Sequence, residues 1–447
     1  MASAAEQLAA NMNFGAFQKA TELHKRIWFT LLALVVYRVG AFVPIPGVNA
    51  EVFKHLFEGQ EKGILGMFNM FSGGAVSRMA IFSLNVMPYI SASIIVQLLG
   101  TTYPPWEKLR KEGGEAGRKQ LNQYTRYLTV LLALLQAFGI GVSLSNSPGV
   151  VDHPGIVFIL TTMVTLVGGT MFLMWLGEQM TSRGIGNGIS MLIFAGIVAR
   201  LIPSAWDILQ EAQIDPTKSF MVFAYAGLSV AVILFIVFME RAQRRLLVVY
   251  PKRQVGNRMT GGENSFLPLK LNVSGVIPPI FASSLLLLPA TAMGFLATAK
   301  LPDWLQWLPL VVGQLTHGKP LFMLLYGALI VFFCFFYTSV QMDPNDTAEN
   351  LRKYGGNLPG IRPGRRTAEY IDYVLTRLTL IGAAYITLVC LLPEFLAGPS
   401  GSYAFGGTSI LIVVSVTMDT VAQIQSHLLA HQYEGLIKKS KLRGVRR

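Results

Sequence analysis

Charged side chains are scarce in this chain. Asp, Glu, Lys and Arg make up 14% of its 447 residues, whereas 52% are hydrophobic. So little charge beside so much apolar composition excludes an ordinary soluble globular protein and indicates a membrane protein. The few charges are mostly basic, with a formal net charge of +13, so their positions along the chain carry information about its orientation.

Cysteine is also rare, and patterns typical of enzymes are missing. Cys334 and Cys390 lie in separate apolar runs without ligand-like neighbours, so we expect them to pack in the interior and to form neither a disulfide nor a metal site. The six histidines fall in loops or at the ends of apolar runs, which argues against a metal site. No Gly-rich phosphate loop precedes a Lys-Ser/Thr pair, and no protease-like Ser/Lys or His/Glu constellation stands out. We expect no cofactor and no enzymatic activity.

Ten apolar runs of about 15 to 22 residues predict ten transmembrane helices. Their bounds are Ile27–Val43, Met79–Leu99, Leu128–Val142, Ile156–Trp175, Ile189–Ile202, Phe220–Met239, Val276–Leu296, Phe322–Val340, Val374–Leu392 and Ile410–Ile424. The first run lacks the small-residue cleavage pattern of a signal peptide, so we expect it to stay in the membrane. An even number of runs places both termini on the same side.

The basic residues indicate which side that is. With both termini cytoplasmic, 29 of the 37 Lys and Arg residues fall on the cytoplasmic face, counting Arg377 at the start of the ninth run. Arg38 lies inside the first run, and the opposite face carries Lys54, Lys62, Arg78, Arg200, Lys218, Lys300 and Lys319. This excess of positive charge inside predicts cytoplasmic termini. Because the basic residues lie in loops between runs, they indicate a surface that faces lipid or a partner protein and argue against nucleic-acid binding.

Four segments outside the runs complete the expected organisation. Residues 1–26 have the pattern of an amphipathic helix on the cytoplasmic membrane surface, and residues 428–447 form a basic cytoplasmic tail. The cytoplasmic loops 240–271 and 341–371 mix basic residues with Gly, Pro and Asn. Long loops of this kind usually carry function, so we expect a docking platform for a large partner. The alternative is a disordered basic hairpin that only enforces topology.

The run count also predicts the fold class, an all-α polytopic membrane protein. The chain divides into an N-terminal half, residues 27–203, and a C-terminal half, residues 219–427, with five runs each. Because five is odd, equivalent runs point in opposite directions, which suits two inverted halves around a central pathway.

One nearly uncharged stretch, Ile64–Gly100, is too long for a single span of about 20 residues. Ser72-Gly73-Gly74 interrupts it near its start. We therefore expect a short re-entrant half-helix, Ile64–Phe71, followed by a full span from Met79. Because irregular backbone is tolerated at membrane depth only where protein or water surrounds it, the interruption predicts an interior cavity that holds a small movable segment.

The runs contain few charged residues that could bind a coupling ion. Apart from arginines near run ends, Arg38 and Asp419 are the charged residues inside them. We expect Arg38 to bond a neighbouring span or backbone carbonyls, and Asp419 to reach the headgroups. The candidate pathway residues are instead aliphatic or uncharged, such as Val86, Ile90 and Ile280. An aliphatic constriction excludes ions without selecting a solute, which fits varied cargo better than one small molecule.

An ordered series of motifs across almost the whole chain resembles the SecY family, the pore subunits of the bacterial protein translocase. The motifs are FVPIPG at 42–47, FNMFSGG at 68–74, MPYISASII at 87–95, GTMFLMWLGEQ at 169–179, RGIGNGIS at 183–190, VIPPIFASS at 276–284, FFCFFYT at 332–338, PGIRPG at 359–364 and FGGTSILIVV at 405–414. The resemblance implies a ten-helix clamshell that conducts unfolded preproteins across the bacterial inner membrane and releases membrane segments sideways.

The resemblance also assigns residues to three parts of the channel. The plug comprises Ile64, Leu65, Met67, Phe68, Asn69, Met70, Phe71, Ser72, Gly73 and Gly74. The hydrophobic pore ring comprises Val86, Ile90, Ile189, Ile193, Ile280 and Ile412. The polar lining of the lateral gate comprises Ser91, Gln97, Asn272, Ser283 and Ser284. For Ser283 and Ser284, hydroxyls that merely allow close helix packing are an equal alternative.

The two long loops match the family's docking site for the ribosome and the SecA motor ATPase. Arg362 is the leading docking residue, followed by Arg253 and Arg258, and Arg365-Arg366 adds positive charge that relatives often lack. The resemblance further implies the small membrane subunits SecE and SecG, signal sequences and preproteins as cargo, and surrounding lipids.

Two rival functions remain. A secondary transporter of a small solute requires midplane charges or broken helices in both halves, and only one broken segment is evident. A non-conducting insertase scaffold explains the basic loops but not an aliphatic ring beside a re-entrant segment.

Overall fold

The computed structural model describes residues 20–58, 69–147, 149–214, 216–250, 253–255, 258–260, 264–296, 313–314, 319–397 and 406–444. The chain forms two compact units. Unit 1 comprises Met1–Tyr89, Arg126–Pro203 and Val416–Arg447, and unit 2 comprises Ile90–Thr125 and Ser204–Ser415.

Unit 1 is helical. It contains α3 (Thr21–Gly40), α4 (Ala50–Glu58), α9 (Ile156–Arg183), α8 (Gly114–Ser145) from Arg126 on, α10 (Gly188–Ile214) up to Pro203, and α17 (Gly407–Gly444) from Val416 on. Its centre is apolar, with Leu166 and Leu173 of α9 fully buried. The rings of Tyr37, Phe82 and Phe172 stack in sequence, with centroids 6.2 Å and 5.9 Å apart. This stack connects α3 to α9 through the irregular segment that precedes α6.

Unit 2 carries the remaining helices. They are α6 (Met87–Thr102) from Ile90 on, α7 (Pro104–Lys111), α11 (Pro216–Arg241), α12 (Ile277–Leu296), α14 (Pro320–Gln341), α15 (Pro344–Lys353) and α16 (Arg365–Ala397). Helix α14 packs against both α12 and α16. Proline fits the first turn of a helix, where its missing N–H has no partner to lose, and α14 and α15 both begin with one. Asp343 caps α15 by accepting a hydrogen bond from the Asn345 amide at 2.8 Å.

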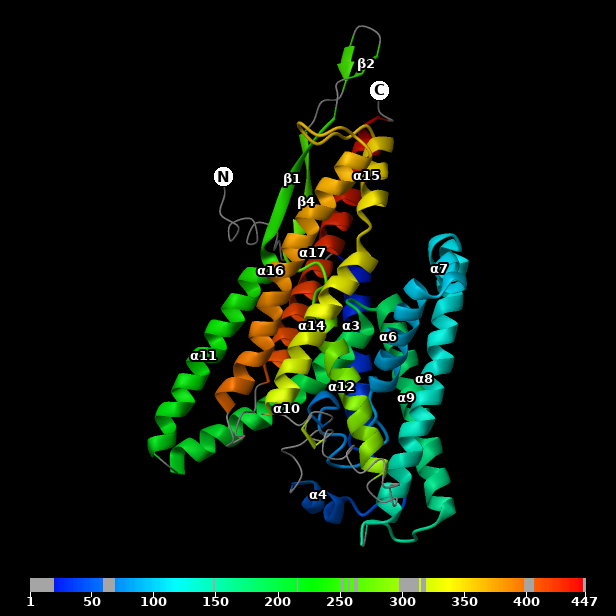
Figure 1. The fold of residues 1–447 in the computed structure, drawn as a ribbon, viewed down its shortest axis with the longest axis vertical. Helices are drawn as coiled ribbons and strands as arrows, with labels where there is room; N and C mark the ends of the chain where they lie inside the picture. Colours follow the sequence, from blue (N-terminus) through cyan, green and yellow to red (C-terminus); the bar gives the residue numbers. More distant parts are fainter. Residues whose placement is uncertain are drawn as a thin grey trace. The chain divides into compact units, whose positions relative to one another are not determined.

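The first long loop, 240–271, folds as a β-ribbon, which the all-α expectation did not include. β1 (Gln243–Val249) pairs antiparallel with β4 (Asn264–Lys270), so that Leu246 faces Leu267 across the ladder. Further along, β2 (Arg253–Val255) pairs with β3 (Arg258–Thr260). Figure 1 shows α11 leading into β1, with α15 and the start of α16 close to the ribbon. Leu246 and Val248, two residues apart, are buried while Leu247 between them is exposed, so β1 has one buried face.

The second long loop, 341–371, joins the ribbon in one folded platform. Val249 and Asn357 exchange two backbone hydrogen bonds, at 2.8 Å and 2.9 Å. An apolar core lies under both loops and consists of Leu246, Val248, Leu269, Leu358, Ile371, Val374, Leu375 and Leu378. We call this structure, residues 243–271 and 342–378, the platform. For the described residues of both loops, this shared core contradicts the disordered hairpin that the sequence left as an alternative.

Each of the ten predicted runs coincides with a helix, but the bounds differ. Six described helical segments are long and apolar enough to cross a membrane: Gly114–Ser145, Ile156–Arg183, Gly188–Trp206 within α10, Pro320–Lys353 with α14 and α15 taken together, Arg365–Pro393 within α16 and Gly407–Ala430 within α17. Helix α17 continues to Gly444 through most of the predicted tail. The ten-span count, the two halves and their orientation stay predictions, and residues 1–19 lie outside the described part of the chain.

The predicted span Met79–Leu99 is wrong at its start. The helix begins at Met87, because residues 72–86 form successive turns and not a helix. Gly73, Gly74, Met79 and Asn85 all have positive φ, at 66°, 85°, 46° and 49°. The hydrophobic run concealed this break, since apolar residues between two turns look like the start of a span.

Two neighbouring leucines test the platform core. Leu246 is 6% exposed and lies in the core, whereas Leu247, on the other face of β1, is 37% exposed. Leu246→Ala should destabilise the platform by about 2–5 kcal/mol, while Leu247→Ala should change its stability by about 0.5 kcal/mol. Amide hydrogen exchange of β1 and β4 measures both effects. Equal exchange rates in the two variants would contradict a shared core.

Candidate functional site

The segment Asn69–Gly74, here called the plug turn, is the described part of the predicted plug. Asn69–Phe71, the described end of the expected half-helix, are helical, and Ser72–Gly74 form a turn. Ile64, Leu65, Met67 and Phe68 lie outside the described residues. The plug turn is buried, with Asn69 at 0%, Ser72 at 1% and Phe71 at 2% exposure.

Three side chains hold three successive carbonyls of the plug turn. Asn85 Nδ2 donates to the Phe71 oxygen at 2.7 Å, and Tyr37 Oη donates to the Ser72 oxygen at 3.3 Å. Arg38 Nη1 donates to the Gly73 oxygen at 2.7 Å. Because a buried carbonyl without a partner costs free energy, these donors are what permits irregular backbone here. The bond from Arg38 confirms the expectation that it binds backbone carbonyls.

Glycines let α10 approach the plug turn closely. A Cβ on Gly196 of α10 would lie 2.5 Å from the Phe71 oxygen, closer than real Cβ contacts. A Cβ on Gly73 would lie 2.9 Å from the Gly196 Cα, and the φ of Gly73 also favours glycine. Two glycines therefore fit against each other across the contact between the plug turn and α10.

The predicted pore-ring residues are divided between the two units. Val86, Ile189 and Ile193 belong to unit 1, and Ile90, Ile280 and Ile412 to unit 2. Ile189 is half-buried, and the other five are at most 7% exposed. The apolar, buried setting agrees with a constriction, and the convergence of the six into one ring stays a prediction.

Three of the predicted gate residues, Gln97 of α6 and Ser283 and Ser284 of α12, make hydrogen bonds within their own helices. Gln97 Nε2 donates to Ser93 Oγ at 3.1 Å. The hydroxyls of Ser283 and Ser284 both donate to the Ile280 oxygen, at 2.9 Å and 2.8 Å. Ser91 is buried, at 4% exposure. Satisfied hydroxyls fit the packing alternative for Ser283 and Ser284, because they make helix contacts without demanding a partner across a seam.

Asn272 lies in a turn before α12, where it forms part of a polar network that the sequence did not predict. Its Nδ2 donates to Glu240 Oε1 at 2.6 Å, and Tyr385 Oη donates to the same oxygen at 3.0 Å. Its Oδ1 accepts from Ser274 Oγ and the Gly275 amide. The network joins the end of α11, the entry to α12 and the middle of α16. Glu240 escaped notice because a single acid at the end of an apolar run looks like a loop residue.

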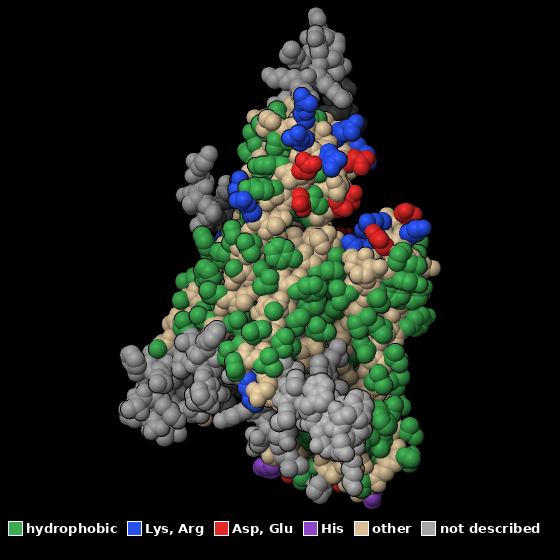
Figure 2. All heavy atoms as spheres, viewed as in Figure 1, with side chains coloured by type: hydrophobic (Ala, Val, Ile, Leu, Met, Phe, Trp, Pro, Cys, Tyr) green, Lys and Arg blue, Asp and Glu red, His purple; other side chains and the backbone are tan. Residues whose placement is uncertain are grey.

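The candidate docking residues lie on the platform. Arg362, Arg365 and Arg366 are exposed, and the Arg362 oxygen accepts a 2.9 Å hydrogen bond from Thr367 Oγ1 at the start of α16. Arg253 and Arg258 lie on β2 and β3. In unit 2, Figure 2 shows basic and acidic side chains gathered over α15 and the start of α16, whereas α14 is covered by hydrophobic ones.

One docking residue has an acidic neighbour. Arg365 forms an ion pair with Glu369 one helical turn later, at 3.2 Å, with both side chains largely exposed. The docking role of Arg365 stays a prediction. Such exposed pairs contribute little to stability, so Arg365 remains able to exchange Glu369 for an acidic group on a partner.

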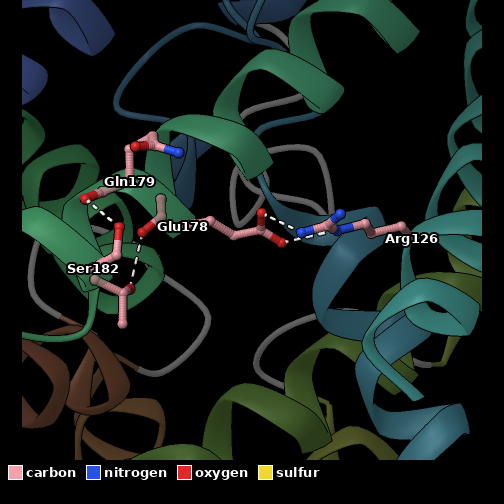
Figure 3. Close-up of polar contacts among 6 residues, drawn as sticks. Arg126, Glu178, Gln179 and Ser182 are labelled. Carbon is pink, nitrogen blue, oxygen red and sulfur yellow. Dashed lines mark hydrogen bonds and ion pairs between the residues drawn. The ribbon is translucent and has the colours of Figure 1, made fainter. Parts of the chain in front are cut away.

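An ion pair joins α8 and α9 in unit 1. Arg126 Nε and Nη2 bond the two carboxylate oxygens of Glu178, at 3.1 Å and 2.7 Å (Figure 3). Two parallel hydrogen bonds fix the geometry as well as the charge. The pair neutralises the acid that follows the fourth predicted run, so Glu178 is not a free carboxylate of the kind that binds a coupling ion. Asp419 is exposed on α17.

Cys334 and Cys390 are buried and not disulfide-bonded, as expected of packing residues. Within the described part of the chain, no group of three or more His, Cys, Asp or Glu side chains is placed to hold a metal ion.

Comparison with known proteins identifies relatives along nearly the whole sequence. The SecY family model matches residues 80–421. The protein translocase subunit SecY of Escherichia coli strain K12 is 51% identical over 430 residues, covering 95% of this chain and 96% of that protein.

Solved structures share the fold. A protein-conducting channel superposes with a TM-score of 0.68 at 17% identity, covering 92% of this chain and 93% of the other. A SecY protein superposes with a TM-score of 0.67 at 18% identity, covering 92% of this chain and 93% of the other. That protein is described as having a plug domain that stabilises the closed channel and maintains a membrane seal. Sec61 from a canine ribosome–channel complex superposes with a TM-score of 0.62 at 18% identity, covering 92% of this chain and 93% of the other.

The glycine contact between α10 and the plug turn generates a prediction. Gly196→Val should push the plug turn out of place, because its side chain would overlap the Phe71 oxygen. Gly168→Val on α9 is the matched control, since a Cβ there meets nothing within 4 Å. The readout is thiol labelling of a buried Ser72→Cys reporter in a background with Cys334 and Cys390 replaced by Ala.

Labelling of the reporter should be about tenfold faster with Gly196→Val, because exposing the reporter would then cost ~1.4 kcal/mol less free energy. With Gly168→Val the labelling rate should be unchanged. Slow labelling in both variants would mean that the contact with α10 does not hold the plug turn.

Proposed function

This chain belongs to the SecY family, and we propose that it forms a protein-conducting channel of the bacterial inner membrane. Unfolded preproteins pass through it, and hydrophobic segments leave sideways into lipid. The observation that carries the proposal is the plug turn, a buried stretch of irregular backbone whose carbonyls are held by Tyr37, Arg38 and Asn85. A solute transporter needs charged or ion-binding groups, whereas a plugged channel needs a removable buried segment.

The hydrogen bonds that hold the plug turn are suited to reversible opening of the channel. Displacing the turn breaks three hydrogen bonds, and such bonds in membrane proteins contribute about 0.6–2 kcal/mol each, hence about 2–6 kcal/mol together. That cost keeps the channel closed at rest, yet it lies within what binding of a signal sequence can supply. The aliphatic residues Val86, Ile90, Ile189, Ile193, Ile280 and Ile412 then form a seal around the chain in transit, because such side chains yield to varied cargo and repel ions.

The lateral gate opens beside α6 and α12. Ser91 and Gln97 line one edge, and Ser283 and Ser284 the other. Because the serines of α12 already bond their own helix, separating the edges leaves few polar groups without partners. The Glu240–Asn272–Tyr385 network anchors the entry to α12, so this end of the gate helix stays fixed to α11 and α16.

The platform docks the partner that drives transport. Its exposed arginines, Arg362 first, contact the SecA motor or the translating ribosome, with Arg253, Arg258, Arg365 and Arg366 extending the contact. The likeness to Sec61 in a ribosome-bound complex supports a ribosome partner. Because β1 and the second loop share one core, a partner that binds either loop also engages the other.

Three further features follow from the family. SecE and SecG are the small membrane partners, both termini are cytoplasmic, and the chain itself has no catalytic activity.

Arg362 tests the docking role of the platform. Arg362→Glu should lower SecA-driven preprotein import into vesicles about tenfold or more, equivalent to ~1.4 kcal/mol of docking free energy, because the reversed charge repels the acidic partner surface. Lys353→Glu on α15 is the control for a general change of charge. Import that falls equally in both variants would show a nonspecific electrostatic effect and remove Arg362 from the docking site.

Deletion of residues 64–74 tests the plug. The variant should leak ions more than the intact chain while still importing preprotein, because the segment seals the pore and takes no part in moving cargo. Conductance of reconstituted bilayers measures the leak, and import into vesicles is measured on the same preparation. An unchanged leak would argue against the plug assignment.

A further inference from the structure

Three arginines surround the plug turn. Arg38 comes from the end of α3, Arg78 from the turns that follow Gly74, and Arg200 from α10. A Cβ built on Gly74 would lie 3.6 Å from Arg200 Cδ and 3.9 Å from Arg78 Nη1, so the two side chains meet at that glycine. Arg38 and Arg78 share the ring of Phe42, with their Cζ atoms 4.7 Å and 4.0 Å from its centroid.

This gathering is unusual for the face of the membrane on which the arginines lie. The charge distribution assigns seven Lys and Arg residues to the outer face, and Arg38 lies toward the outer end of the first run. Three of these few cations converge on one turn. Like charges held this close repel one another, and half-burial weakens the screening by water. A phosphate between Arg38 and Arg78, which share the ring of Phe42, would lower their mutual repulsion.

One arginine also has unused hydrogen-bonding capacity. Arg78 Nη1 is buried and has no hydrogen-bond acceptor among the described residues. A guanidinium presents a planar fork of donors that suits carboxylate and phosphate oxygens. Because Arg38 Nη1 already donates to the Gly73 oxygen, a ligand has to reach the other donors of these side chains without breaking that bond.

The surface beside the cluster is apolar and exposed. Val39, Phe42 and Val43, around the end of α3, are 61%, 51% and 45% exposed. An anionic group next to an apolar surface at the membrane boundary matches a phospholipid, with its phosphate on the arginines and an acyl chain along α3. A free phosphate ion would satisfy the arginines but leave the apolar surface uncovered.

We propose that Arg38, Arg78 and Arg200 form a phosphate-binding site beside the plug turn, and that its ligand is the headgroup of a membrane phospholipid. The bound phosphate neutralises the clustered charge and keeps Arg38 in place to hold the Gly73 oxygen. Lipid composition therefore sets how strongly the plug turn is held in its buried position. The site does not require that the chain conduct proteins.

The test compares the chain in two bilayers, one containing phosphatidylglycerol and one made only of the phosphate-free lipid digalactosyldiacylglycerol. The readout is the labelling rate of the Ser72→Cys reporter in the background without other cysteines. Four forms are compared: the unchanged cluster, Arg200→Gln, Arg200→Lys, and Lys54→Gln. Lys54→Gln removes one outer-face charge on α4, outside the cluster.

Labelling should be about tenfold slower in phosphatidylglycerol than in the phosphate-free bilayer, both for the unchanged cluster and for Lys54→Gln. Arg200→Gln should lose this difference in labelling rate between the bilayers, and Arg200→Lys should retain most of it. Because Arg200→Lys keeps the positive charge, its result distinguishes loss of the charge from misfolding caused by the substitution. Native mass spectrometry should find a retained phosphatidylglycerol that Arg200→Gln no longer holds.

Two results would overturn the proposal. Equal labelling of the unchanged cluster in both bilayers would exclude the phosphate site. Full protection by inorganic phosphate added to the phosphate-free bilayer would replace the lipid headgroup with free phosphate as the ligand.

Discussion

The structure of unit 1 depends on satisfying backbone carbonyls where no water reaches them. Irregular backbone within a membrane protein survives only if protein groups bond it, and the plug turn meets this condition through Tyr37, Arg38 and Asn85. The same requirement explains the paired glycines, since α10 lies against the plug turn only without side chains between them. A segment held by a few replaceable bonds is stable when seated and still removable, which a gate requires.

Unit 2 is under a different constraint, because its charged loops have to form a defined surface. The platform does so with a core of its own beneath the ribbon and the second loop. The exposed arginines Arg362, Arg365 and Arg366 therefore lie beside an ordered core, and a partner that binds them loses little entropy in ordering this loop. The network at Glu240 connects the base of the ribbon to the entry of α12, where Asn272 follows β4 by two residues.

Hydropathy alone located every apolar run on a helix. For Arg38 the sequence left two partners open, a neighbouring span or backbone carbonyls, and the structure shows a backbone carbonyl. It did not find the true start of α6 at Met87, because the turns before it are built from residues as apolar as the helix. It also missed the β-ribbon and the Glu240 network, which depend on contacts between segments distant in sequence. The plug, ring and gate residues came from a resemblance in motifs, since no periodicity distinguishes a pore-lining isoleucine from one in a core.

The central claim is that this chain conducts proteins. The most direct test is import of an unfolded preprotein into sealed vesicles that hold the chain with its small membrane partners, with motor ATPase and ATP outside. If the chain conducts proteins, the cargo becomes protected from protease only when ATP is present. Folded, correctly oriented chain that protects no cargo would contradict it, and would favour a solute transporter or a non-conducting scaffold.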